Sequence, residues 1–577
     1  MPLNPIMRTQ RFSRASGRGV AVAATALLAA LIVASGVPGA QSRPKFLSDD
    51  PLVREPETQD AAKVQEWELG LIADLTLNVF ANPGDPTRGV RAQNVSTVDE
   101  VPDSSWFTNR IYTRPISVEE IARGPNTIDG PAPGTWTIIR PKTAGTAPGF
   151  TVRDEKNNVW FVSMDVRGYP VAATAANMVA TRLFWALGYN QVEAYITTIR
   201  SETVVIGDKV TIRSHGRRRR FTRADLDAVF AAAHRNLDGG YRVIAARGLP
   251  GRVIGGYKYF GTRPDDPNDV VPHEHRRELR ALQVFGGWTN LVDLKAGNTL
   301  DTVITEKGRS IVKHYLQDVG STFGTGSRGP RAGDEGWEHV FEGGPTVKRL
   351  VSLGFYIRPW QTVDYDEHPE IGLFTARAYE PREWRPRVPA AALHHIRPDD
   401  EFWAALRVMS FTDEQIRAAV KTGQYTDPAA EKLLADVLMK RRDRIGRVYF
   451  ALVNPLTRFA LDAGGVLTFE NAAVRFHTAD APKGGYTATW SRFDNTTRAA
   501  QPLGTATTSA RERLQAPSDL PRGAGSYIKV SIAAVDPPSP PWATPVDVYF
   551  RSTAAGWQLV GVERVPEGPA PFSAPGK

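Results

Sequence analysis

Two short polar motifs separated by a strand-like segment constrain the fold of this chain more than any other feature. Asp293 is followed five residues later by Asn298, with Lys295 between them, and Asp318 begins an Asp-Val-Gly triplet. The residues between the motifs form two partly β-branched runs on either side of a Glu-Lys-Gly-Arg turn, a pattern typical of a β-hairpin. Because a hairpin brings its two ends together, Asn298 and Asp318 are predicted to lie side by side.

The spacing of these motifs resembles the catalytic loop and the metal-binding turn of protein kinases. By this resemblance Asn298 and Asp318 would bind Mg²⁺, which prefers oxygen ligands and takes few of them from the protein. Asp293 would accept a proton from a substrate hydroxyl, and Lys295 would meet the phosphate transferred from ATP. A plainer interpretation is that Asp and Asn cap the turns at the hairpin ends, but the lysine and the second motif favour the kinase-like site.

Residues 135–212 are predicted to form a small β-rich lobe with one helix at about 172–187. A turn containing Gly145 and Gly149 joins two of its strands. Glycine lets a backbone come close to a ligand, so the amides of this turn are candidates for contacting nucleotide phosphates. The same two-glycine turn is also common in ordinary hairpins.

The lobe departs from the kinase pattern at two positions. Active kinases carry a lysine on the strand after the glycine loop and pair it with a helix glutamate. The pattern places Ser163 and Asn177 at these positions. Losing both members is physically coherent, because a lone buried charge costs several kcal/mol. Lys142, just before the glycine turn, is the candidate replacement; otherwise the site has drifted toward a pseudokinase.

The predicted fold class is α+β: a two-lobed protein-kinase-like core, with a small β-rich lobe and a larger helical lobe, followed by a β-sandwich-like C-terminal domain. A helical stretch is also expected within residues 61–80. Alternating apolar runs separated by Gly, Pro and Ser indicate the C-terminal strands. The predicted segments are a signal peptide or anchor at 1–42, an N-terminal extension at 43–134, the small lobe at 135–212, the helical lobe at 213–460 and the β-rich domain at 463–570.

The first residues predict export. Several arginines precede an apolar run at 19–35, and small residues follow it. If the segment is not cleaved, this run is near the lower length limit for a membrane anchor, so a periplasmic, extracellular or outward-facing anchored protein is expected. The chain contains no cysteine, which excludes disulfides and thiol chemistry. The net charge of +9 is spread along the chain, with a cluster at 217–220, and a nucleic-acid partner is not expected.

Several further runs have a family resemblance, and together with the two motifs they span about residues 60–460. They are Asp99–Phe107, Phe184–Tyr189, Thr262–Asp269 and Pro272–Arg280. They resemble an uncharacterised family of exported bacterial proteins with a kinase-like core, distantly similar to HipA-type and CotH-type atypical kinases. This resemblance implies the fold more firmly than the activity.

Two main functions therefore remain open from the sequence, and an enzyme with different chemistry on the same fold, for example nucleotidyl transfer, is a further alternative. The first is an exported kinase-like phosphotransferase that uses Mg²⁺ and ATP on an unknown protein or small-molecule substrate. The second is a non-catalytic pseudokinase-type scaffold of the cell envelope, which the loss of the lysine–glutamate pair favours. The intact Asp293, Asn298 and Asp318 favour the first. The run His273-Glu274-His275 does not have the spacing of a zinc protease site.

Overall fold

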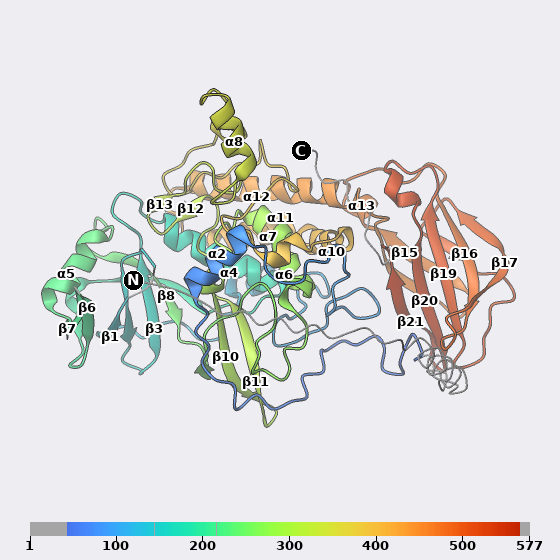
Figure 1. The fold of residues 1–577 in the computed structure, drawn as a ribbon, viewed down its shortest axis with the longest axis horizontal. Coiled ribbons are helices and arrows are strands. Elements are labelled where there is room, and N and C mark those ends of the chain that lie inside the picture. Colours follow the sequence, from blue (N-terminus) through green and yellow to red (C-terminus); the bar gives the residue numbers. More distant parts are fainter. Residues whose placement is uncertain (1–42, 143–144, 215, 566–577) are drawn as a thin grey trace, which may run out of the picture. The chain divides into compact units, whose positions relative to one another are not determined.

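The computed structural model describes residues 43–142, 145–214 and 216–565, which fall into two compact units. One unit contains residues 43–45 and 494–499, and the other contains 46–493 and the chain from 500 onward. The second unit has a mixed α/β fold with several sheets (Figure 1). Within the described ranges, no helix has the length and apolar character needed to cross a membrane. The predicted targeting segment at 1–42 lies outside the described residues.

A six-stranded sheet carries the glycine turn. Its order is β4-β8-β3-β2-β1-β5, so the strands on either side of the turn, β1 and β2, are neighbours. Helix α4 (Ala172–Leu187) follows β3 and ends at Gly188, which confirms the predicted helix. Strand β8 follows the predicted small lobe in the sequence and pairs between β3 and β4. The bounds are β1 Trp136–Pro141, β2 Gly149–Arg153, β3 Val159–Met164, β4 Ala194–Ile199, β5 Val204–Ile206 and β8 Tyr241–Arg247.

Strands β10 (Thr299–Glu306) and β11 (Arg309–Leu316) form the predicted hairpin. They pair in continuous antiparallel register from Thr299 opposite Leu316 to Glu306 opposite Arg309. Lys307 and Gly308 both have positive φ angles, of 49° and 78°, as the two central residues of a tight hairpin turn require. The turn sequence therefore fixes the register, and the register fixes which residues meet at the open end.

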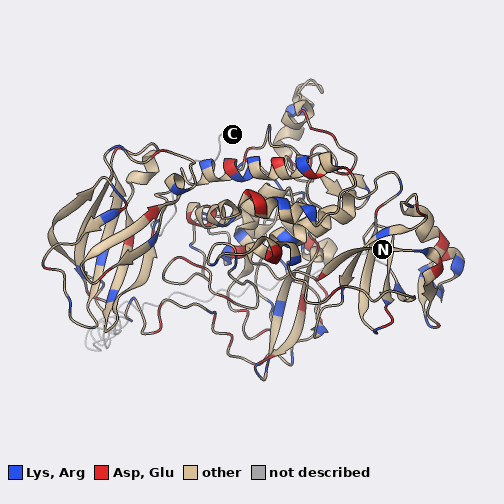
Figure 2. Cartoon of the chain, turned by 180° about the vertical axis from the view of Figure 1, so that it is seen from behind, with Lys and Arg blue, Asp and Glu red and all other residues tan. Residues whose placement is uncertain are grey.

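Several helices lie in the chain between 273 and 449, before and after the β10–β11 hairpin. The predicted helix at 275–291 is divided into a short turn at His273–His275, α6 (Arg277–Arg280) and α7 (Leu282–Thr289). Helix α7 ends at Asn290, whose φ of 56° is left-handed. The other helices of this region include α8 Gly343–Val351, α9 Ala391–His394, α10 Pro398–Met409, α11 Asp413–Lys421 and α12 Pro428–Tyr449, and blue and red residues alternate along α12 in Figure 2.

The chain after residue 455 is built from antiparallel strands. Strand β19 alternates strictly, with Ile528, Val530, Ile532 and Ala534 buried, as the sequence pattern predicts. The predicted sandwich-like arrangement stays a prediction. One sheet has the order β14-β15-β18 (Leu456–Leu461, Val466–Asn471, Arg513–Gln515), and the other has β17-β16-β19-β20-β21 (Ala500–Ser509, Tyr486–Phe493, Tyr527–Ala534, Val546–Thr553, Gly556–Glu563).

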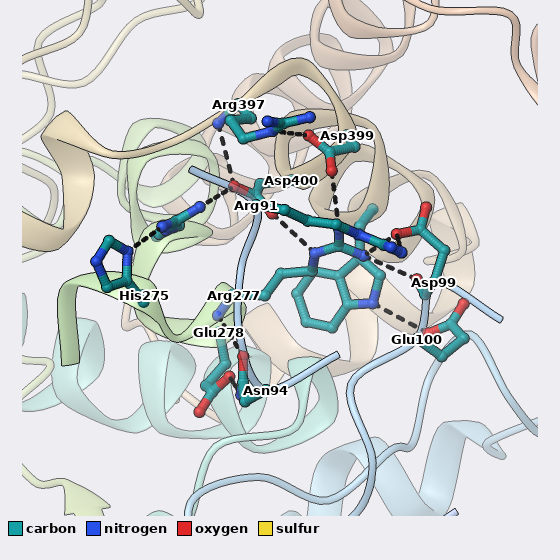
Figure 3. Close-up of polar contacts among 12 residues, drawn as sticks. Arg91, Asn94, Asp99, Glu100, His275, Arg277, Glu278, Arg397, Asp399 and Asp400 are labelled. Atoms are coloured by element: carbon teal, nitrogen blue, oxygen red, sulfur yellow. Dashed lines mark hydrogen bonds and ion pairs between the residues drawn. The ribbon is translucent and has the colours of Figure 1, made fainter. Parts of the chain in front are cut away.

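A buried network of arginines and aspartates joins α6 to α10 and to the N-terminal extension (Figure 3). Arg277 lies 2.8 Å from Asp400, 2.9 Å from Asp99 and 3.2 Å from Asp399. Arg280 contacts the second oxygen of Asp400 at 3.1 Å. Burial opposes the ionisation of Asp99, but the surrounding arginines, Arg277 first, outweigh it and lower the pKa of this carboxyl below its usual range. The network thus holds α6 in place, together with α7, which leads directly into the loop at 291–298.

Candidate functional site

The open end of the hairpin brings the two motifs together. The backbone oxygen of Asn298 accepts hydrogen bonds from the amides of Gln317 and Asp318, both at 3.1 Å. The Asn298 side chain donates from Nδ2 to the backbone oxygen of Asp293 at 2.7 Å. This contact orients the amide so that Oδ1 is the atom available as a metal ligand. The structure therefore brings Asp293 and Asn298, before β10, close to Asp318, after β11, as the hairpin prediction requires.

The Asp-Val-Gly triplet has an exposed end and a buried middle. Val319 is fully buried in the main core, whereas the Asp318 side chain is exposed and accepts a hydrogen bond from the Gly320 amide at 3.0 Å. Helix α4 approaches on the other side, because a Cβ built on Gly320 would lie 3.0 Å from Asn177 Nδ2. Asn177 thus lies beside the Asp-Val-Gly turn, and it carries no charge there.

Lys142 reaches the position at which the kinase pattern has lost its lysine. Its Nζ donates a hydrogen bond to Ser163 Oγ at 2.9 Å. Partial desolvation lowers the pKa of Lys142, and the nearby Asp318 carboxylate opposes that shift, although the lysine side chain keeps contact with solvent. Lys142 therefore contacts Ser163 and lies close enough to Asp318 for the two charges to interact.

Gly149 makes room for this lysine. Gly149 stands opposite Ser163 in the β2–β3 register. A Cβ at Gly149 would lie 2.1 Å from the backbone oxygen of Val162 and 3.3 Å from Lys142 Cδ, so any larger residue would displace one of them. Gly145 has a φ of 75° at the exposed turn. The hydroxyl of Thr146, next to Gly145, forms a hydrogen bond with Ser327 of the segment that follows the Asp-Val-Gly triplet.

Two cations flank the Asp293 carboxylate. Lys295 Nζ lies 2.9 Å from Asp293 Oδ2, and an Arg331 guanidinium nitrogen lies 3.8 Å from the same oxygen. Arg331 is held by Ser321 Oγ at 2.5 Å and by Glu335 at 3.3 Å. The motifs did not reveal Arg331, since it lies in a glycine-rich stretch with no distinctive spacing. The sequence signal that would have drawn attention to it is only its place shortly after the second motif.

Helix α2 (Leu71–Phe80) packs on the loop that contains Asn298. A Cβ on Gly297 would lie 3.4 Å from a methyl group of Leu71. Within α2 only Asp74 and Asn78 are buried, whereas apolar residues such as Ile72 and Phe80 are 84% and 70% exposed. The predicted helical stretch at 61–80 is therefore helical only from 71 onward, and its polar side faces the protein.

The inner face of α2 leaves polar atoms unmatched. Within the described residues, Asp74 Oδ1, Asn78 Oδ1 and Tyr259 Oη are buried without a hydrogen-bond partner. Burial raises the pKa of Asp74. Burial also raises the pKa of Tyr259, and the charges of Asp293 and Asp74 add to this rise, so Tyr259 lies close to both carboxylates.

The histidine cluster has a structural environment. His273 contacts Asp269 Oδ2 at 2.8 Å, and His275 contacts Asp85 Oδ2 at 3.0 Å. Both histidine side chains are buried. Across the part of the chain that the structure describes, no three His, Asp or Glu side chains gather in a way that would hold a metal ion. Any divalent ion at the candidate site would therefore rely on Asp318, Asn298 and ligand oxygens.

Comparisons with known proteins give few matches. No family model and no curated protein matches this chain. Among solved structures, it is similar to the Golgi casein kinase with Mn/ADP bound, at 12% identity and a TM-score of 0.29, over 57% of this chain and 74% of that chain. A second structure of the Golgi casein kinase gives 12% identity and a TM-score of 0.30, over 70% and 94%. TM-scores this low carry no inference, so the candidate site rests on the contacts described above, and the resemblance to HipA-type and CotH-type kinases stays a prediction.

Proposed function

We propose that this protein is an atypical phosphotransferase whose active site lies between the six-stranded sheet and the open end of the β10–β11 hairpin. The observation that carries the proposal is the contact of Lys142 with Ser163 beside Asp318. Lys142 thereby supplies a positive charge at Ser163, the position at which the kinase pattern would have a lysine. The absence of a side chain at Gly149, opposite Ser163, leaves room for both the Val162 backbone oxygen and the Lys142 side chain.

The side chains at the site fit a divalent cation and a nucleotide. Asp318 offers a solvent-exposed carboxylate, and Asn298 offers an amide oxygen from the neighbouring turn. One carboxylate and one amide suit Mg²⁺ or Mn²⁺, which keep several positions for water and phosphate oxygens. When bound, the ion would neutralise charge on the phosphates. Lys142 would hold a phosphate from the sheet side, and the turn from Gly145 to Gly149 would lie over it.

Asp293 is the residue proposed to act on the substrate. Its carboxylate would accept the proton of a substrate hydroxyl as the hydroxyl oxygen bonds to the γ-phosphorus of ATP and the bond from that phosphorus to ADP, the leaving group, breaks. Lys295 and Arg331 lie at the same carboxylate oxygen and would hold the incoming phosphoryl group near it. The substrate is an unidentified molecule with a hydroxyl group, and we place the reaction outside the cytoplasm because of the predicted export segment.

A non-catalytic, nucleotide-independent scaffold is the second candidate. The observation that favours it is Asn177, which lies in the first half of α4 beside Gly320 and supplies no carboxylate to pair with Lys142. In kinases an acid at this place fixes the lysine for catalysis. If the scaffold interpretation is right, Lys142 and Asp318 serve only to neutralise each other at the surface.

A thermal-shift titration separates the two candidates. The full chain is titrated with ATP in the presence of Mg²⁺, Mn²⁺ or EDTA, beside Asp318→Ala, Lys142→Met and a control, Lys209→Met, which removes an exposed lysine elsewhere. A ligand at about 100 times its Kd stabilises the folded state by roughly 2.7 kcal/mol. We expect a metal-dependent rise in Tm for the wild type and the control that both site variants lose.

The transfer of the γ-phosphate to water or to the protein itself is then measured by phosphate release and by mass spectrometry. Metal-dependent turnover that Asp293→Asn abolishes, with binding retained, supports the enzyme. Nucleotide binding without turnover supports a pseudokinase. A wild type that shows no shift at millimolar ATP with either metal contradicts the proposal and favours the scaffold.

A further inference from the structure

One cavity of the protein has a volume of about 440 Å³. Its walls come from the segment around residues 382–396, from α10 and α12, and from Arg88 and Gly89 of the N-terminal extension. None of the residues placed in the candidate site lines it. It therefore requires an explanation of its own, and that explanation does not rest on the proposed function.

The cavity gathers unpaired positive charge. Arg88, Arg382 and Arg385 all line it. Arg382 has a distant partner in Glu401, at 3.7 Å. Arg385 donates only to the backbone oxygens of Arg382 and Trp384, and no carboxylate in the described ranges forms an ion pair with Arg385 or Arg88. Guanidinium groups without carboxylate partners at a concave surface form a positive potential that attracts anions.

His339 and His394 also line the cavity. Desolvation by the surrounding protein, followed by the charge of Arg88, lowers the pKa of His394 to about 4. His339 and Arg385 add to the shift. The positive charge of the cavity at neutral pH therefore comes from its arginines, and the histidines are neutral hydrogen-bonding groups.

Two buried oxygens at the cavity lack partners. Tyr449 Oη and Glu401 Oε2 are each buried and, within the described residues, form no hydrogen bond. Burial raises the pKa of Glu401 to about 7, so its carboxyl group is protonated for much of the population near neutral pH and can donate. Buried polar groups in folded proteins are nearly always satisfied, so a water or a ligand in this cavity is the natural partner for these two oxygens.

We propose that this cavity binds a small organic anion, with its phosphate or carboxylate group on Arg88 and Arg385 and its apolar part against Pro386, Leu393 and Ile396. Arginine is suited to both acids because its planar donors match two oxygens at once. The size of the cavity is within the range of small-molecule sites. The mixture of cationic and apolar walls distinguishes an organic anion from a bare inorganic ion.

A trapped water is the simpler alternative, and it explains less. One water would satisfy Tyr449 and Glu401, as buried waters commonly do. It would leave two guanidinium groups without an anion at the cavity, and it would not account for the apolar wall beside them. An anion accounts for the charges, and Tyr449 and Glu401 line the same cavity.

The test is isothermal titration calorimetry on the full chain with four probes: phenyl phosphate, benzoate, inorganic phosphate and benzyl alcohol. We expect one or both aromatic anions to bind saturably, inorganic phosphate to bind more weakly, and benzyl alcohol not to bind. The two aromatic anions separate a phosphate-selective site from a carboxylate-selective one. Arg88→Gln and Arg385→Gln should each weaken the preferred anion by about tenfold or more.

Two controls keep the result interpretable. Arg213→Gln removes an exposed arginine elsewhere and should leave the affinity unchanged, and Asp318→Ala should do the same. Arg88 is exposed, so its variant should fold even if that of Arg385 does not. The inference is overturned if neither aromatic anion binds at about 10 mM. It is also overturned if binding is insensitive to Arg88 and Arg385, or if Asp318→Ala abolishes it and so assigns the anion to the other site.

Discussion

Two clusters of charged residues in this protein differ in almost every physical respect. Around Arg277, guanidinium and carboxylate groups are fully buried and each aspartate has an arginine within 3.2 Å. Around Asp318, the charged groups are partly or wholly exposed, and Lys142 hydrogen-bonds a neutral serine. In the first cluster the chain satisfies its own charges, and in the second it leaves them available.

The difference separates charges that hold the fold from charges that meet a ligand. Buried ions are retained only when their partners compensate for lost hydration, so such a network tolerates no missing member. Exposed ions lose little when a partner is absent, because water replaces it. The stability of this protein should therefore depend on Arg277, and its ligand binding on Asp318 and Lys142.

The largest effect should come from breaking the buried cluster. Arg277→Met would leave Asp99, Asp399 and Asp400 short of a cation, and removing one partner of a buried network typically costs about 3–5 kcal/mol. Urea unfolding followed by tryptophan fluorescence measures this loss. Arg213→Gln, on the exposed strand at 211–214, should change the unfolding free energy by less than about 0.5 kcal/mol. An equal effect of the two substitutions would remove the distinction between the clusters.

Glu401 tests the comparison further, because it is a buried acid whose one ion-pair partner among the described residues, Arg382, lies 3.7 Å away. Its pKa is raised to about 7 in the folded protein, above the ordinary value of 4.5. The unfolded chain therefore releases the proton first, and the stability present below about pH 4.5 is lost as the pH rises through 7. Glu401→Gln removes this dependence.

We expect the stability of Glu401→Gln, relative to the wild type, to be about 2 kcal/mol greater at pH 8 than at pH 5. Denaturant unfolding of both proteins across this range measures the difference. A gap between the two proteins that stays constant with pH would mean that Glu401 ionises normally in the folded state.

The third prediction concerns the room that the exposed cluster needs. Gly149→Ala places a methyl group 2.1 Å from the backbone oxygen of Val162 and against Lys142. Overpacking of this kind typically costs about 1–3 kcal/mol, and it should also weaken Mg²⁺-ATP binding by displacing the lysine. Gly343→Ala is the matched control, because a Cβ there meets nothing within 4 Å. Loss of stability without loss of nucleotide binding would show that Lys142 does not contact the nucleotide.

The smallest effect on stability should come from the exposed cluster itself. Asp318→Ala is expected to change the unfolding free energy by no more than about 0.5 kcal/mol, as for most exposed positions. The same variant should lose the metal-dependent part of the ATP thermal shift. Strong destabilisation without ligand would place Asp318 with the structural charges instead.

The local parts of the candidate site could be predicted from the sequence. The hairpin is encoded by two β-branched runs and by Lys307 and Gly308, so the meeting of Asn298 and Asp318 follows from short-range information. Helix α4 can also be predicted, because its apolar face and the Gly188 that follows its last residue are local signals. Lys142 was identified by its place before the glycine turn, and the structure adds its contact with Ser163.

The missed parts depend on contacts between distant segments. Arg331 reaches Asp293 only because the chain after the second motif folds back, and the partners of Arg277 lie at residues 99 and 400. Periodicity shows which face of a helix is apolar, but it does not show which face packs inward. For α2 the packed face is the polar one, since Asp74 and Asn78 are the residues it buries.

Because α2 packs with its polar side inward, it affects the order in which segments of the protein unfold locally. Helix α2 has ten residues, too few to be stable alone, and it buries almost none of its own apolar surface. The free energy that separates its docked state from a locally unfolded one is therefore small compared with that of α12, whose apolar residues lie in the main core. Native-state hydrogen exchange should report amide protection rising from α2 to α12. The loop at 293–298 is thus bordered by one of the first segments of this chain to exchange.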